Sequence, residues 1–330
     1  MEVKKINMKI VHLVLSDNFA GIEQHVDELL SSNLFNKSIL VCNKSISHYF
    51  DKNIRTFVIK NIGRRSLWGK YKLKKLLNQI NPDIVHTHGS KTTSIISSIN
   101  KKNFKHVATV HGIKKNKKVY EKADLVIGVS KKTIKGIKNK SVVITNWWNP
   151  KLVKFNSNEN EYALAIGRLE KIKGFDLLIT SWKNIKSNLV IIGSGKEKQR
   201  LVDLIDQNNL TAKIRIIDDV QRDELINFYK NASVLIISSR DEGGPRVALE
   251  ALFLQIPVLS TDVGHMSNIL PNELLAKKND KESLKKLLET HVDNIELMNQ
   301  DAIFEYITND YSIEKKVLEI IRCYEDLFNN

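Results

Sequence analysis

Two pairs of charged residues in the second half of the chain are spaced for ligand binding, one pair cationic and one pair acidic. Arg168 and Lys173 stand five residues apart in GRLEKIKG, directly after a short apolar run. An arginine fork and a lysine point charge at a strand-to-helix turn can together hold a diphosphate. Glu242 and Glu250 stand eight residues apart in EGGPRVALE, where Pro245 suits the first turn of a helix. Their carboxylates are suited to accept hydrogen bonds from sugar hydroxyls.

Glycines accompany these charges at the ends of predicted strands. Gly193 lies in IIGSGK, where a glycine permits a tight turn or the close approach of a ligand. The segment is not a dinucleotide fingerprint, because Lys198 stands in place of the third glycine, and it lacks the glycine spacing of a P-loop. The amides of Gly243 and Gly244 precede a predicted helix and are expected to point at an anion.

Three histidines end predicted strands of the first half. His86 and His88 alternate in VHTHG, and His111 lies in TVHG. Zinc is bound by such side chains, but no convincing carboxylate or thiol ligand accompanies them in the sequence. We therefore expect no metal site and interpret His86 and His88 as packing or loop residues.

Short buried strands are needed to position all of these residues. Apolar runs of four to seven residues suit parallel strands covered on both faces, and they alternate with helical patterns that indicate βαβ units. The sequence thus predicts an α/β fold of two doubly wound domains, with ligands at the carboxyl ends of the strands. The predicted strands are 9–15, 38–42, 56–59, 83–86, 106–110, 125–129, 142–145, 162–166, 189–192, 214–217, 234–238 and 257–260.

A polar stretch at 149–161 separates the two predicted domains, 1–150 and 151–330. It contains a proline and lacks periodicity, and 330 residues suit two domains of ordinary size. Residues 312–328 carry an apolar stripe at helical spacing. They predict a terminal helix of the second domain that packs back toward the first.

The positive charge is concentrated in the first half. Residues 1–150 hold 28 Lys and Arg against 9 Asp and Glu, or +19, whereas residues 151–330 come to −4. This asymmetry indicates an anionic partner, which is nucleic acid, anionic lipid or a phosphorylated lipid carrier, unless it reflects a solvated lysine-rich surface. Residues 64–80 predict a basic helix with Trp68 and Tyr71 near its start, which is either a membrane-surface element or an ordinary solvated helix face. Two cysteines, one in each half, fit a reducing cytoplasm.

The order of these motifs resembles family 4 of the retaining glycosyltransferases, whose fold is the two-domain GT-B type. The second half carries GRLEKIKG, IIGSGKEKQRL, SSRDEGGPRVALEAL and PVLSTDVG, and the first half carries FAGIEQHV, PDIVHTHG, TVHG and ADLVIGVS. The resemblance spans nearly the whole chain, and the two glutamates following GRLEKIKG are highly specific as a set. It implies two Rossmann-like domains that face each other across a cleft.

The resemblance also implies roles for the charged residues. Arg168 and Lys173 match the pair that binds the donor diphosphate. Glu242 matches the glutamate near the donor sugar, and Glu250 matches the one on the ribose. His111 matches a histidine beside the transferring sugar, so His111 and Glu242 are the expected catalytic residues.

Smaller residues complete the implied donor site. Gly21 matches a first-domain loop that closes over the diphosphate, and Gly193 lies in the second glycine-bearing motif. Val220 matches a position where backbone meets the nucleobase, and Gly243 and Gly244 match the loop whose amides meet sugar and phosphate. The chain departs from the family pattern at several positions, which bears on the identity of sugar and base: Ala20, 146–150, Asp219, His265 and Asn268.

The expected activity is retaining, metal-independent transfer from a UDP- or GDP-sugar to a lipid-linked, lipopolysaccharide or polysaccharide acceptor in bacterial surface-glycan synthesis. No cofactor and no divalent metal are expected, and the absence of an Asp-x-Asp pair disfavours the other large glycosyltransferase fold with its divalent metal. The basic first half predicts an enzyme at the cytoplasmic face of the inner membrane, attached peripherally to anionic lipid, without nucleic acid as a partner.

Three alternatives share part of this pattern. A GT-B sugar-nucleotide epimerase uses the same nucleotide pocket without an acceptor. A DNA-modifying glucosyltransferase is also basic, although the family 4 motifs disfavour it. A basic nucleic-acid-binding protein would show steep salt dependence and no need for Glu242 or Glu250; no nucleic-acid-binding signature supports it.

Overall fold

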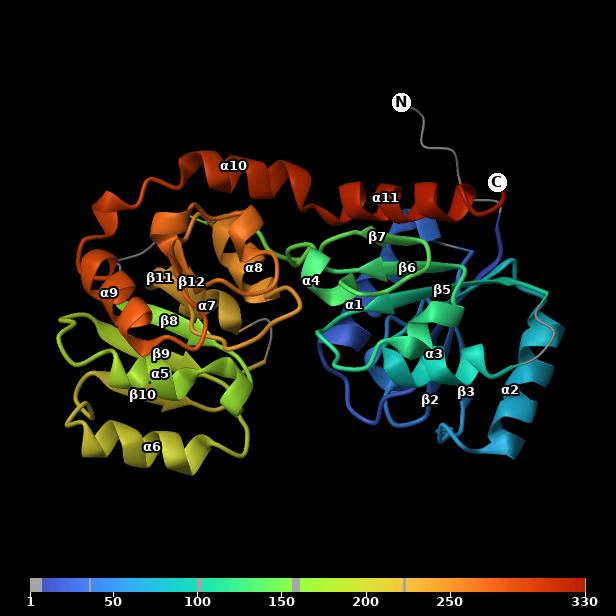
Figure 1. The fold of residues 1–330 in the computed structure, drawn as a ribbon, viewed down its shortest axis with the longest axis horizontal. Helices are drawn as coiled ribbons and strands as arrows, with labels where there is room; N and C mark the ends of the chain where they lie inside the picture. Colours follow the sequence, from blue (N-terminus) through green and yellow to red (C-terminus); the bar gives the residue numbers. More distant parts are fainter. Residues whose placement is uncertain (1–7, 36, 100–102, 156–160, 222–223, 330) are drawn as a thin grey trace. The chain divides into compact units, whose positions relative to one another are not determined.

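The chain folds into two compact units in a computed structural model that describes residues 8–35, 37–99, 103–155, 161–221 and 224–329 (Figure 1). The first unit comprises Met1–Asn146 together with Ile313–Asn330, and the second comprises Trp147–Ser312. Each unit contains one sheet whose paired strands are all parallel.

The first unit is built on a seven-stranded sheet in the order β3-β2-β1-β4-β5-β6-β7. Its strands are β1 (Ile10–Val14), β2 (Ile39–Asn43), β3 (Arg55–Ile59), β4 (Ile84–His88), β5 (Lys105–Val110), β6 (Leu125–Gly128) and β7 (Ser141–Val143). Its α-helices are α1 (Gly21–Ser31), α2 (Leu67–Ile80), α3 (Ser90–Ser97), α4 (Lys131–Ile134) and α11 (Ile313–Glu325). The strand order reverses between β1 and β4, so that the loops after these strands diverge there.

The second unit has a six-stranded sheet in the order β10-β9-β8-β11-β12-β13. Its strands are β8 (Tyr162–Ile166), β9 (Asn188–Ile192), β10 (Ile214–Ile217), β11 (Ala232–Ile237), β12 (Val258–Thr261) and β13 (Leu275–Ala276). Its α-helices are α5 (Phe175–Thr180), α6 (Lys198–Gln207), α7 (Leu225–Lys230), α8 (Arg246–Phe253), α9 (Lys281–His291) and α10 (Asp301–Asp310). The order reverses between β8 and β11.

These two sheets confirm the predicted doubly wound α/β class. Every predicted strand overlaps an observed one, because a buried parallel strand leaves a continuous apolar run in the sequence. The sequence does not predict β13, whose two residues are too few to leave such a run. In the second unit, α-helices and sheet enclose a core that includes the fully buried indole of Trp182, whose N–H donates to the Ser187 carbonyl at 2.9 Å.

The C-terminal helix α11 belongs to the first unit, which agrees with the prediction that it packs back toward the first domain. This differs from the range 151–330 given to the second domain. Its apolar stripe is buried, and the Tyr324 hydroxyl lies 2.5 Å from His86 Nδ1 on β4. The units divide between Asn146 and Trp147, slightly ahead of the polar stretch at 149–161, of which 156–160 lie outside the described residues.

Candidate active site

The strand reversal of the second sheet brings two predicted site residues into contact. Lys173 follows β8 and Glu242 follows β11, and their side chains form a largely buried ion pair between Lys173 Nζ and Glu242 Oε1. Ser239 Oγ also donates to Glu242 Oε1, at 2.9 Å. Ligands of doubly wound sheets bind where the order reverses at the carboxyl ends of the strands. The pair therefore occupies the position at which this fold places a ligand.

Two glycines let the loops of this edge approach each other. Gly174 has φ +67°, and a Cβ there would lie 2.1 Å from the Ser238 carbonyl oxygen. A Cβ on Gly193 would lie 1.9 Å from the Gly167 carbonyl oxygen. The loops after β8, β9 and β11 thus touch through backbone atoms, and this contact holds Lys173 beside Glu242.

Arg168 follows the same strand as Lys173 but is oriented differently. Its side chain is 69% exposed and pairs with Glu170, with Nη1 and Oε1 2.7 Å apart. The structure does not bring Arg168 onto the Lys173–Glu242 pair. Since a surface pair of this kind is worth at most about 1 kcal/mol, the guanidinium is available to turn toward a phosphate.

The remaining predicted residues of the second unit surround the same edge. Glu250 is buried on α8, and its Oε2 accepts a hydrogen bond from the Tyr229 hydroxyl at 3.2 Å. Val220 lies after β10 and packs partly against the core. Gly243 and Gly244 precede α8. They lie close to Gly264 in the loop after β12, where an added Cβ would be only 3.0 Å from Gly244 Cα. The structure thus gathers these residues around one sheet edge.

In the first unit, Gly21 is the first residue of α1. It is exposed, and a Cβ there would meet no atom within 4 Å. The turn is held instead by Glu23, whose carboxylate accepts the Ala20 N–H at 2.9 Å and the Ser16 hydroxyl. Nothing in the described local packing demands glycine at this position.

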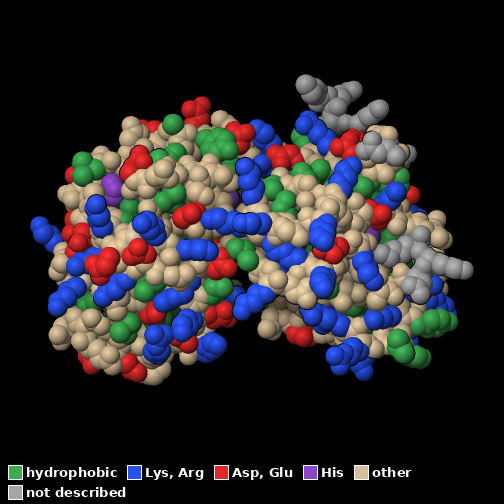
Figure 2. All heavy atoms as spheres, in the orientation of Figure 1, with side chains coloured by type: hydrophobic (Ala, Val, Ile, Leu, Met, Phe, Trp, Pro, Cys, Tyr) green, Lys and Arg blue, Asp and Glu red, His purple; other side chains and the backbone are tan. Residues whose placement is uncertain are grey.

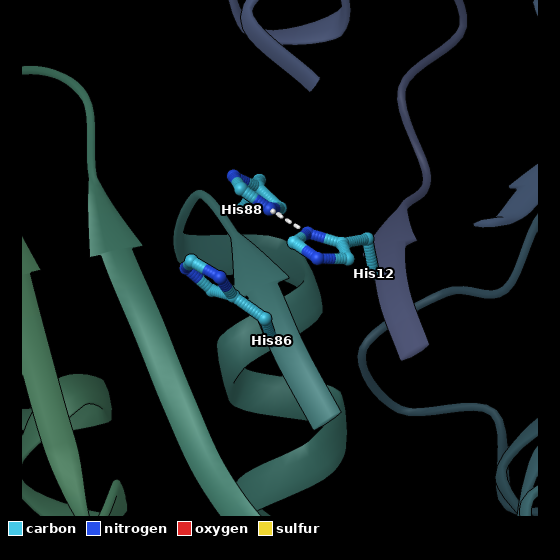
Figure 3. A group of neighbouring side chains, drawn as sticks. All are labelled: His12, His86 and His88. Atoms are coloured by element: carbon cyan, nitrogen blue, oxygen red, sulfur yellow. Dashed lines mark hydrogen bonds between the residues drawn. The ribbon is translucent and has the colours of Figure 1, made fainter. Parts of the chain in front are cut away.

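His111 lies in a chain of contacting imidazoles. His88 Nδ1 is 3.2 Å from His111 Nε2, and His88 Nε2 is 3.1 Å from His12 Nδ1. Figure 3 shows His12 and His88 reaching toward each other from β1 and β4, with His86 beside them. His86 is held by the Tyr324 hydroxyl and by Thr109 Oγ1 at 2.6 Å. His86 is thus a packing residue, as expected, whereas His88 belongs to the contacts around His111.

The imidazoles of His12, His86 and His88 are neutral at physiological pH. Burial lowers the pKa of His12 to about 3. Burial, with smaller effects of neighbouring histidines, holds the pKa values of His86 and His88 well below their usual range. A desolvated imidazole loses its proton because burial penalises the charged form. These side chains therefore act as hydrogen-bonding groups or ligands, not as cations.

The sequence alone does not identify three residues that lie near the predicted site residues: two lie in the histidine cluster, and one lies beside Glu242. His12 lies within the first apolar run and resembles a core residue, and His25 lies on the inner face of α1, with its ring 4.7 Å from that of His111. Ser239 lies in the SSRDEGG motif, and its proximity to Glu242 in sequence is the signal that points to it. For the two histidines, only the pairing of distant elements reveals the cluster.

Two family models match the chain in sequence. The model for glycosyl transferases group 1 matches residues 151–302, and that for Glycosyltransferase Family 4 matches residues 21–146. The chain belongs to the glycosyltransferases. This assignment confirms the resemblance and the enzyme class predicted from the motifs.

Relatives and solved structures agree with the assignment. An uncharacterized glycosyltransferase of Methanocaldococcus jannaschii is 28% identical to this glycosyltransferase over 93% of this chain and 95% of its own. A UDP-Gal:alpha-D-GlcNAc-diphosphoundecaprenol alpha-1,3-galactosyltransferase of Escherichia coli is 26% identical over 98% of both chains. The lipopolysaccharide outer core galactosyltransferase WaaB has a TM-score of 0.79 at 18% identity, covering 97% of this chain and 99% of its own. The last similarity concerns the fold alone.

Proposed function

We propose that this glycosyltransferase moves a sugar from a UDP- or GDP-sugar to a lipid-linked or polysaccharide acceptor, with retention and without a divalent metal, in bacterial surface-glycan synthesis. The observation that carries the proposal is the Lys173–Glu242 pair at the strand reversal of the second sheet. The names of relatives support the substrate classes, since the Escherichia coli enzyme uses UDP-Gal and a diphosphoundecaprenol acceptor.

The proposed chemistry depends on stabilising the departing diphosphate. Lys173, with Arg168 after rotation away from Glu170, neutralises the charge that develops on the leaving group. The amides at Gly243 and Gly244 add partial positive charge ahead of α8. Glu242 then accepts hydrogen bonds from the donor sugar. These cations take the role that a divalent metal has in other nucleotide-sugar enzymes, which is the reason for proposing metal independence.

The other predicted residues orient the donor in this proposal. Glu250 binds the ribose, Val220 contacts the base through its backbone, and Gly193 lets the ligand approach the loop after β9. For the first unit, the family resemblance is the basis for giving His111 a role at the transferring sugar and Gly21 a role at the diphosphate. Transfer with an acceptor distinguishes this enzyme from an epimerase, which would release free sugar products.

A nucleotide panel tests the donor assignment. A ligand at 100 times its dissociation constant stabilises the native state by about 2.7 kcal/mol, which thermal unfolding detects. We expect one nucleotide class to stabilise the wild type and to lose this effect in Glu250→Ala and Arg168→Ala. No response to any nucleotide or nucleotide sugar, with salt-sensitive binding to DNA instead, would contradict the proposal and favour the nucleic-acid alternative.

Helix α2 supports the proposed membrane attachment. It begins after the N-cap Ser66 and presents three large apolar side chains to solvent: Leu67, Trp68 and Tyr71 are 82%, 68% and 66% exposed. The Lys72 ammonium lies 3.6 Å from the centre of the Trp68 ring. Figure 2 shows hydrophobic side chains gathered at the lower right, over α2, beside basic ones. Apolar anchors flanked by lysines suit a bilayer surface that contains anionic lipid.

Lipid binding by α2 is the second testable part of the proposal. In the part of the chain that the structure describes, no helix is long and apolar enough to cross a bilayer. We expect the protein to float with vesicles that contain anionic lipid, and Trp68→Ser with Tyr71→Ser to lower the partition coefficient at least about 10-fold, because two aromatic anchors leave the interface. Tyr49→Ser, which removes another exposed aromatic of the same unit, is the matched control. Equal flotation of both variants would rule out α2 as the anchor.

A further inference from the structure

Three histidines from separate elements converge in the first unit. His25 comes from α1, His88 from the end of β4 and His111 from the segment after β5. One nitrogen of each lies within 4.8 Å of the others, and the rings of His25 and His111 meet edge to face. His25 and His88 are buried, whereas His111 is partly exposed. The cluster is thus closed on the protein side and accessible at His111.

One of the three separations is close to that of a tetrahedral metal site, and the other two lie within 4.8 Å. Zinc binds histidine nitrogen at about 2.0–2.1 Å, which places neighbouring ligand atoms roughly 3.3–3.4 Å apart. His88 Nδ1 and His111 Nε2 are 3.2 Å apart, close to this value. A small movement of the His25 side chain completes a set of three nitrogens.

His12 holds the imidazole of His88, the middle residue of the three, in place. His88 Nε2 lies 3.1 Å from His12 Nδ1, as Figure 3 shows. Histidines that bind metals commonly donate their other ring N–H to an acceptor, which fixes the tautomer and the ring orientation. His86 lies close to His12 and His88 as well, but both of its nitrogens contact hydroxyl groups, of Tyr324 and Thr109. This favours the set with His25 and His111 over the set with His12 and His86.

We propose that His25, His88 and His111 bind one Zn²⁺ ion, with a fourth position open to solvent, and that the ion inhibits transfer by occupying His111. Three imidazoles with an open fourth position form a recognised type of zinc site. The binding site stands on the histidines alone, whereas the inhibition rests on the proposed role of His111 at the donor sugar. The inference leaves the transfer reaction itself independent of metal and adds an ion that would regulate it.

Zinc binding is measured without any assay of transfer. The full chain is dialysed against a chelator and then titrated with Zn²⁺ in competition with a chromophoric chelator, with Mg²⁺ in a parallel titration. We expect one equivalent of Zn²⁺ and no Mg²⁺, because imidazole is a poor ligand for Mg²⁺. His25→Asn and His88→Asn are each expected to weaken binding at least about 10-fold. His48→Asn, which removes an exposed histidine of the same unit, keeps wild-type affinity.

Circular dichroism and thermal unfolding establish that each variant is folded, and His25→Asn backs up His88→Asn should the latter fail this check. No stoichiometric Zn²⁺ binding by the wild type, or binding unchanged in His25→Asn, would overturn the site.

The inhibition is tested separately. Zn²⁺ that fills the site should stop nucleotide release in the wild type, a chelator should restore it, and His25→Asn should resist inhibition. Full binding with undiminished transfer would overturn the inhibition. Binding as expected by a protein that transfers no sugar would support the site while contradicting the proposed function.

Discussion

Replacing Lys173 by alanine is expected to lower kcat/KM for transfer by about 10²–10³-fold, the usual cost of removing a group that stabilises charge in the transition state. Lys173 is largely buried against Glu242, so its loss also leaves a carboxylate uncompensated at the proposed diphosphate site. The measurement is nucleotide release under steady-state conditions, with donor affinity determined by calorimetry.

Lys171→Ala is the matched control for this prediction. Lys171 lies on the same short 3₁₀ turn, Lys171–Lys173, but is exposed. It should retain most of the wild-type rate, because a solvated charge contributes little at a distance. A Lys173→Ala enzyme as active as Lys171→Ala would show that the pair does not serve the leaving group.

A double-mutant cycle separates the contribution of the pair from that of each residue. Glu242→Gln alone should also impair transfer. If Lys173 and Glu242 act as one unit, the double variant will lose much less than the sum of the two single losses. Strict additivity would mean that the residues act independently of the contact seen between their side chains.

Gly174→Ala is expected to destabilise the second unit by about 2–5 kcal/mol. A left-handed backbone conformation costs a residue with a Cβ about 1–2 kcal/mol, and a steric overlap in a packed region adds about 1–3 kcal/mol. Both apply at Gly174, where φ is +67° and the Ser238 carbonyl oxygen would lie 2.1 Å from the new atom. Urea unfolding measures the change.

Gly63→Ala serves as the control for this substitution. A Cβ at Gly63 meets no atom within 4 Å, and this glycine is not among those with positive φ. The free energy of unfolding of Gly63→Ala should therefore change little, or rise slightly because alanine makes the unfolded chain less flexible. Equal stability of the two variants would contradict the close approach of the loops after β8 and β11.

Local patterns carry much of the fold and several of the site residues. Each predicted strand was found because burial on both faces leaves an apolar run that is visible without knowledge of its neighbours. The motifs around Lys173 and Glu242 are local in the same sense, since each lies at a single strand-to-helix turn. The amphipathic stripe of 312–328 likewise predicts a helix from its own spacing.

Partners that are distant in sequence depend on the tertiary structure. Lys173 and Glu242 are 69 residues apart and meet because the strand order places β8 beside β11. Tyr324 and His86, 238 residues apart, meet because α11 packs on the first unit. An apolar stripe specifies that a helix must be covered, but not by which surface.

The histidines show most clearly that contacts between distant residues cannot be predicted from local sequence. The sequence alone indicates His111 and treats His86 and His88 as ordinary strand-end residues, while His12 and His25 give no local signal of function. Parallel pairing of β1 with β4 and of β4 with β5, with α1 packed beside them, brings these imidazoles into contact. The sequence by itself determined every strand except β13, the two-domain α/β class and the motifs proposed to bind the donor, because these depend on neighbouring residues. Only the tertiary structure decided which charges pair and which imidazoles cluster, because the order of strands in a sheet is set by packing between segments remote in the chain.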